Sequence, residues 1–133
     1  MPERKTSGSA GYDLAAARDC ILKRGEVAIV PTGLKAYMQE DEYLGLHIRS
    51  GLSLKHRLML VNSQGIIDSD YYNNADNEGH IMVAVLNLGE KDVPVEKGMR
   101  IAQGIFYKYL VVDGDEAGQG ASRKGGFGST GEE

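Results

Sequence analysis

The stretch Leu44-Gly45-Leu46-His47-Ile48-Arg49 places an apolar residue at every second position. Successive side chains of a β-strand point to opposite faces of a sheet, so this pattern predicts a strand with one buried face. Upstream, residues 27–30 lead into the turn sequence Pro-Thr-Gly at 31–33, which predicts another strand. Downstream, the apolar run IMVAVLNL at 81–88 predicts a central strand buried on both faces.

Further short apolar segments lie between turn residues, at 58–61, 66–67 and 101–109. One short helix is expected at 50–56, with the Ser50 side chain capping its first turn. Strands that recur roughly every ten residues with frequent glycine are typical of sandwiches and barrels. The sequence therefore predicts an all-β fold, a distorted jelly-roll sandwich or barrel, with one short helix.

Composition excludes several classes of protein. The chain has 133 residues, a length that suits one domain, and its single cysteine, Cys20, excludes an internal disulfide framework. Its three histidines show no metal-ligand spacing, and the net charge of -4 gives no electrostatic reason to bind nucleic acid. No apolar run reaches the length of a membrane span. We expect a soluble, cytoplasmic protein.

Composition changes after residue 112. Residues 113–133 contain seven glycines and one aromatic residue, Phe127, and cannot supply a core. The chain is therefore divided into a β domain at 1–112 and a flexible C-terminal arm at 113–133. The order GGFGSTG at 125–131 also suits folding over a ligand, because the ring can stack on a base while amides and hydroxyls bind phosphate oxygens.

Two aspartates, Asp68 and Asp70, stand at the end of the predicted strand in GIIDSDY. In an extended chain both carboxylates point to one face, where they can orient a water or hold a cation. The alternative is an acidic turn. Asp13, in AGYDL, adds one more carboxylate near the start of the chain, where a lone aspartate in a turn is normally structural.

Two segments combine an arginine with other polar donors. In Arg49-Ser50-Gly51 a guanidinium and a hydroxyl precede helical amides, a combination that suits phosphate; an ordinary N-cap beside a surface arginine is the alternative. In GMRIAQ at 98–103, Arg100 and Gln103 bracket the start of a strand, where turn and edge residues are the default explanation.

In this order the motifs resemble those of the trimeric dUTPases, which hydrolyse dUTP on a β jelly roll. The segments are SAGYDL at 9–14, RSGLSLKH at 49–56, NSQGIIDSDY at 62–71, GMRIAQ at 98–103 and GGFGSTG at 125–131. The resemblance covers essentially the whole chain. It implies a homotrimer with shared active sites, in which a neighbour lends the C-terminal arm and Mg2+ is the cofactor.

The resemblance also implies roles for individual residues. Asp68 would hold the water that attacks the α-phosphorus, and Asp13 would fix Mg2+ through coordinated waters. Asn62 and the neighbouring hairpin backbone would bind uracil. Tyr71 would pack on the deoxyribose and exclude a 2'-hydroxyl. The remaining substrate-binding residues would be Arg49, Ser50, Gly51 and Gln103 on the phosphates, Phe127 stacked on uracil, and Arg123, Ser129 and Thr130 closing on the phosphates.

Three features depart from the family pattern. Only residues 1–8 precede SAGYDL, so a first strand is expected to be missing. About six polar residues at 72–77 are interpreted as an insertion that lengthens a hairpin. One residue separates Arg123 from Gly125 where the family has two, so Lys124 can share the phosphate role.

Two other functions stay open from sequence. One is a nucleotide-binding or regulatory module on the same fold that does not hydrolyse its ligand. The other is a relative of dCTP deaminase, although that branch generally has a longer chain and a catalytic glutamate where this motif has Asp68.

Overall fold

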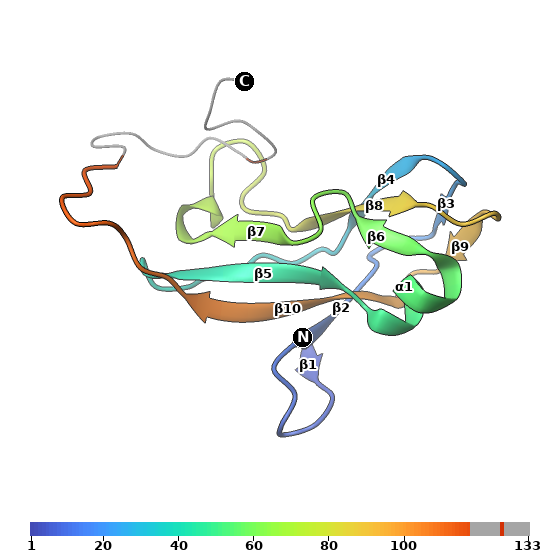
Figure 1. Cartoon of the computed structure of the whole chain (residues 1–133), viewed down its shortest axis with the longest axis horizontal. Helices are drawn as coiled ribbons and strands as arrows, with labels where there is room; N and C mark the ends of the chain where they lie inside the picture. Colours follow the sequence, from blue (N-terminus) through green and yellow to red (C-terminus); the bar gives the residue numbers. More distant parts are fainter. Residues whose placement is uncertain (118–125, 127–133) are drawn as a thin grey trace.

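A computed structural model describes residues 1–117 and Gly126. Its strands form three antiparallel sheets (Figure 1). The largest has the order β1 (Glu3–Arg4), β2 (Tyr12–Ala15), β10 (Arg100–Lys108), β5 (Glu42–Ile48) and β7 (Gly65–Asp68). The second has the order β4 (Val27–Pro31), β8 (Met82–Asn87) and β6 (Leu58–Leu60), and the third pairs β3 (Cys20–Leu22) with β9 (Val93–Val95). The described residues also contain one helix, α1 (Ser50–His56), and one 3-10 turn, η1 (Ser69–Tyr71), so the predicted all-β architecture with one short helix is confirmed.

The core lies between the two larger sheets. Leu44 and Leu46 of β5 and Val83 and Val85 of β8 are nearly inaccessible and belong to one apolar cluster. Figure 1 shows β5 and β10 in one layer and β4, β6 and β8 in the other. The layers are linked by the chain that runs from β6 to β7 and from η1 to β8, and the site described below lies among these links.

The strand at 81–88 differs from its prediction. In β8, buried Val83, Val85 and Asn87 alternate with half-buried residues, so only one face is fully covered in the single chain. The strand is central in its sheet, as predicted, but the apolar run did not show that one of its faces is only half-buried. Asn87 interrupts the apolar run and is buried nevertheless. Its Nδ2 donates to the carbonyls of Leu22 and Lys91, which satisfies the amide inside the core.

The N-terminal strand expected to be missing is present in short form. Glu3 and Arg4 pair with Asp13 and Tyr12, so β1 covers part of the β2 edge. The Arg4 side chain closes this hairpin by donating to the carbonyls of Ser7 and Ser9. Two residues suffice because the turn, rather than an apolar pattern, holds the strand.

The helix prediction is right in extent and wrong in its cap. The N-cap of α1 is Arg49, which has extended backbone angles and no side-chain capping bond, and Ser50 is already helical. The start of the helix is instead attached to β10, since the Arg49 N–H donates to the carbonyl of Ile101.

The two strands around motif NSQGIIDSDY do not form the expected hairpin. β6 belongs to the three-stranded sheet and β7 to the five-stranded sheet, so the turn at residues 61–64 carries the chain between layers. For the same reason the polar segment at 72–80 is not a hairpin extension, since β7 and β8 belong to different sheets. It is a compact loop around buried Asn74.

Residues 113–117 contain neither helix nor strand, and the division of the chain at residue 112 stays a prediction. Within the part of the chain that the structure describes, no helix has the length and apolarity needed to cross a membrane.

Candidate functional site

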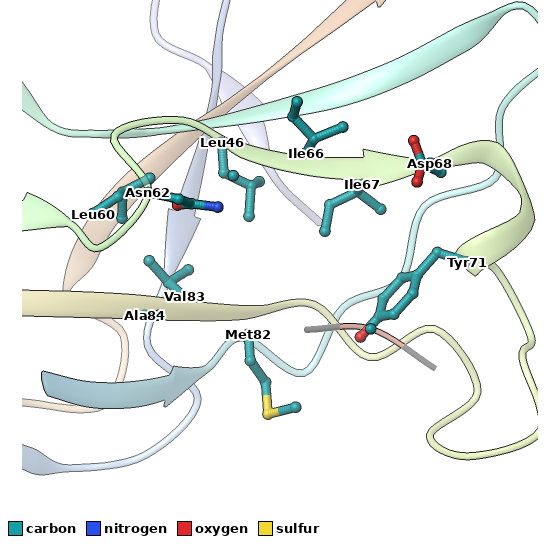
Figure 2. A pocket seen from close by; sticks show the side chains of 12 residues that line it. Leu46, Leu60, Asn62, Ile66, Ile67, Asp68, Tyr71, Met82, Val83 and Ala84 are labelled. Carbon is teal, nitrogen blue, oxygen red and sulfur yellow. The ribbon is translucent and has the colours of Figure 1, made fainter. Parts of the chain in front are cut away.

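A cavity of about 160 Å³ lies between β7 and β8 (Figure 2). It brings together three residues that sequence reasoning selected for a nucleotide: Asn62, Asp68 and Tyr71. Its other walls come from the two sheets and from Gly126: Leu46, Leu60, Gly65, Ile66, Ile67, Met82, Val83 and Ala84. The pocket thus combines apolar walls with a few polar groups, as small-molecule sites do.

The backbone of β7 borders this pocket along its whole length. β7 is the last strand of its sheet, and no strand of the described residues pairs with its outer edge. Such an edge presents N–H and C=O groups in a row. A flat ring with alternating donors and acceptors on its rim is the kind of ligand that this edge can recognise.

Asp68 is the acidic residue of the pocket. It ends β7, opposite Tyr43 of β5, and its side chain is exposed. The same-face pair of Asp68 and Asp70 was expected for an extended chain. The chain is not extended there, because η1 begins at Ser69. Only Asp68 lines the cavity.

Asn62 and Tyr71 stand at different points of the pocket wall. Asn62 lies in a tight turn, where Ser63 has a φ of 61° and Gln64 N–H donates to the Asn62 carbonyl at 2.6 Å. Tyr71 is 6% exposed, and its hydroxyl donates to the carbonyl of His80 at 2.7 Å. Gly126 lies against the ring, since a Cβ there would stand 3.0 Å from Tyr71 Cε1. The described arm residue therefore lies at the same pocket.

A second polar cluster lies at the other end of β5. Asp13 is flanked by Arg49, with Nε at 3.8 Å from Oδ1, and by Arg100, with Nη1 at 3.5 Å from Oδ2. Gln103 pairs directly with Asp13 in the register of β10 and β2, which puts both side chains on one face. Gly11 makes room for Gln103, because a Cβ on Gly11 would lie 3.0 Å from its Oε1. Ser50 and Gly51, the first residues of α1, follow Arg49 and are exposed.

The pocket and the second cluster are far apart within one chain. Asp68 is opposite Tyr43, near the start of β5, and Arg49 follows its end. The strand rise of about 3.3 Å per residue from Tyr43 to Arg49 gives a separation of about 20 Å. Asp68 and Arg49 of one chain are therefore too far apart to act on one phosphate group.

Comparison with known proteins identifies the family of this chain. The dUTPase family model matches residues 1–131. The chain belongs to the dUTPase family. The deoxyuridine 5'-triphosphate nucleotidohydrolase of Lactococcus lactis is 50% identical over 131 residues, covering 98% of this chain and 87% of that protein. The enzyme of the same name from Rickettsia prowazekii is 42% identical over 136 residues, covering 98% and 88%.

Solved structures of dUTPases share the fold of this chain. The dUTPase of Streptococcus mutans superposes with a TM-score of 0.82 at 46% identity, covering 86% of this chain and 89% of that one. A dUTPase from phage phi11, described with a structural Mg(II) ion, has a TM-score of 0.73 at 21% identity and supports the fold alone. The predicted jelly roll of the dUTPase family is confirmed.

The predicted site residues come from separate segments of the chain. The structure brings Asn62, Asp68 and Tyr71 into one pocket and Asp13, Arg49 and Gln103 into one cluster. Four predicted residues lie outside the described part of the chain: Arg123, Phe127, Ser129 and Thr130.

Sequence reasoning missed Met82 in the pocket wall and the loop residues that contact the Tyr71 hydroxyl. The spacing of Asn74, Asn77 and Gly79, all favoured in turns, was the available signal for an ordered loop.

The described site residues offer few ligands for a divalent metal ion. Among residues 1–117 and Gly126, no group of three or more histidine, cysteine or acidic side chains is arranged to hold a metal. Asp13 is a single carboxylate between two guanidinium groups. This donor set suits Mg2+ that is held mainly by ligand phosphates and keeps its waters, with Asp13 as an outer carboxylate.

Proposed function

We propose that this member of the dUTPase family hydrolyses dUTP to dUMP and pyrophosphate, with Mg2+, as a cytoplasmic homotrimer. The observation that carries the proposal is the single pocket that contains Asn62, Asp68 and Tyr71, with Gly126 against the Tyr71 ring. The names of the relatives at 50% and 42% identity support the same substrate.

Uracil would lie along the edge of β7. Uracil and cytosine present reversed donors and acceptors at ring positions 3 and 4, so a rigid backbone edge that matches one leaves groups unpaired with the other. A hydrogen-bonding mismatch of this kind can discriminate by ~10^4. Asn62, at the turn before β7, would complete the contact with the base.

Asp68 would orient the attacking water. The water oxygen forms a bond to the α-phosphorus while the bond from that phosphorus to the bridging oxygen breaks, so pyrophosphate leaves and dUMP remains. The Asp68 carboxylate accepts the proton that the water loses. Since most of the barrier to phosphoryl transfer lies in positioning and charge, holding the water at a fixed angle is its main contribution.

The cluster of Asp13, Arg49 and Gln103 would act on the phosphates. Arg49 and Gln103 supply donors to phosphate oxygens, with Ser50 and Gly51 beside them. Mg2+, when bound, offsets the negative charge of the triphosphate, and Asp13 would contact its waters.

The separation of about 20 Å along β5 argues that each active site is assembled from more than one chain. The pocket with Asp68 would come from one subunit, and the Arg49 cluster from another. The C-terminal arm, with Arg123 and Lys124, Phe127, Ser129 and Thr130, would close over uracil and the phosphates.

The experiment is pyrophosphate release with Mg2+ from dUTP, UTP, dCTP and dTTP, with ammonia measured in parallel. Release from dUTP alone is the expected result. Binding of dUTP without turnover by folded protein would favour a nucleotide-binding module, and ammonia from dCTP would favour a deaminase.

A further inference from the structure

The Tyr71 hydroxyl uses its hydrogen-bonding capacity on the loop at 72–80. It donates to the His80 carbonyl at 2.7 Å and accepts from Asn77 Nδ2 at 2.8 Å. A phenol has one O–H to donate, so these two bonds fix both its donor and an acceptor position. The end of the ring is thus held from two directions.

The Asn77 amide has one orientation in this loop. Its Oδ1 accepts from Asn74 Nδ2 at 2.7 Å and from Gly79 N–H at 3.1 Å. Both partners are donors, so the oxygen must face them and the NH₂ group must face Tyr71. The donor that Tyr71 meets is therefore set by the loop.

Asn74 ties the same loop to the Tyr71 backbone. It is 5% exposed, and its Nδ2 donates to the Tyr71 carbonyl at 2.8 Å while its Oδ1 accepts from the amides of Asp76 and Asn77. Gly79, with φ of 89°, closes the loop. A Cβ at this position would lie 2.9 Å from the backbone carbonyl oxygen of Tyr71. Only glycine fits this approach without a shift of backbone.

The loop is also anchored to the opposite segment of chain. Gly33 N–H donates to His80 Nε2 at 3.0 Å, and Lys35 Nζ donates to Asn73 Oδ1. The carbonyl that receives the Tyr71 hydroxyl therefore belongs to a fixed residue. A ring held in this way, with Gly126 against its edge, cannot swing aside to admit extra atoms on a sugar.

We propose that Asn77 is a specificity-determining positioning residue, which keeps the Tyr71 ring in the pocket wall and so sets the preference for a 2'-deoxyribose over a ribose. The inference rests on the proposed function, because it concerns the sugar of the nucleotide in that pocket. Asn77 acts through Tyr71 and does not line the cavity itself.

The test compares kcat/KM for dUTP and UTP in four proteins: wild type, Asn77→Asp, Tyr71→Phe and the double variant. A carboxylate at 77 retains the acceptor for Asn74 and Gly79 but has no N–H for the Tyr71 hydroxyl. We expect Asn77→Asp to lower the dUTP-to-UTP ratio by about three- to tenfold, the effect of one net hydrogen bond. The double variant should show no further loss beyond Tyr71→Phe, since without the hydroxyl residue 77 has no contact with the ring to change.

Asn73→Asp is the matched control, because it makes the same chemical change in the same loop at a side chain that contacts Lys35 and not Tyr71. Its ratio should equal that of wild type. An unchanged ratio in Asn77→Asp, or additive losses in the double variant, would overturn the inference.

Tyr71→Phe guards against a loop that does not fold, because it removes only the hydroxyl. An unchanged ratio in Tyr71→Phe also overturns the inference. Failure of the proposed function looks different, since wild type would then release no pyrophosphate from dUTP.

Discussion

The two ends of β5 carry opposite kinds of chemistry. At the Tyr43 end, the pocket has apolar walls, the acidic side chain of Asp68, and an edge of β7 with which no strand of the described residues pairs. At the Arg49 end, two guanidinium groups each lie within 3.8 Å of the Asp13 carboxylate. The first end suits recognition of a flat ring by shape, and the second suits a highly charged group. A nucleoside triphosphate needs both, and one chain keeps them apart.

The largest expected effect is at the pocket end. Asp68→Asn should reduce the rate of pyrophosphate release by at least ~10^2, because the amide holds the water less firmly than a carboxylate and cannot accept its proton. Binding of a non-hydrolysable dUTP analogue, measured by calorimetry, should change by less than about tenfold. Asp70→Asn is the control, since Asp70 does not line the pocket. Equal turnover in the two variants would remove Asp68 from the mechanism.

At the charged end, Arg49→Ala should lower kcat/KM for dUTP by about 10- to 100-fold, the effect of losing a charge-assisted hydrogen bond to phosphate. Arg100→Ala should cost less, because that side chain is 51% exposed against 28% for Arg49. Steady-state kinetics and a melting curve for each variant make the comparison. Equal losses for the two arginines would mean that this end attracts phosphate only through its summed charge.

Asp13→Asn tests whether the carboxylate serves the metal or the arginines. If it contacts the waters of Mg2+, the Mg2+ concentration for half-maximal activity should rise by about tenfold, while added chelator should stop wild type completely. A lower melting temperature with an unchanged Mg2+ curve would instead assign Asp13 to holding Arg49 and Arg100.

The smallest expected effect is at the contact between the arm and the pocket. In Gly126→Ala the new Cβ would meet Tyr71 Cε1 at 3.0 Å. Because the ring is fixed at its hydroxyl, the arm must shift, and we expect a loss of about two- to fivefold in kcat/KM with no change in melting temperature. Gly8→Ala is the control, since a Cβ there meets nothing within 4 Å. Equal kinetic constants in the two variants would show that Gly126 has no part in the active site.

The alternation of Leu44, Leu46 and Ile48 was enough to predict β5, because apolar residues two apart share one face of a strand. Leu44 and Leu46 are buried and Ile48 is half-buried, while Gly45 is also buried although it lies on the other face. The two-residue strand β1 left none, since a hairpin turn holds it rather than apolar packing. Asn87 is a second case that the sequence alone does not reveal. A polar residue whose hydrogen bonds are made inside the core cannot be distinguished from a surface residue by its type.

For the site, the motifs pointed to individual residues but not to their grouping in space. Asn62, Asp68 and Tyr71 were known to be close in sequence, and the structure adds that they share one cavity. The distance between Asp68 and Arg49 could not be read from spacing, because it depends on which ends of β5 they occupy. The contact of Asn77 with the Tyr71 hydroxyl depends on left-handed residues in the loop, such as Glu78 at φ of 62°.

The central claim is that the two ends of β5 in different chains serve one active site. The direct measurement is dUTP turnover after Asp68→Asn and Arg49→Ala subunits are unfolded and refolded together in equal amounts. Each variant alone should retain at most about a tenth of wild-type activity. The mixture should recover about a quarter, because random association gives that share of sites both intact residues. Activity no greater than the sum of the two separate variants would contradict the account.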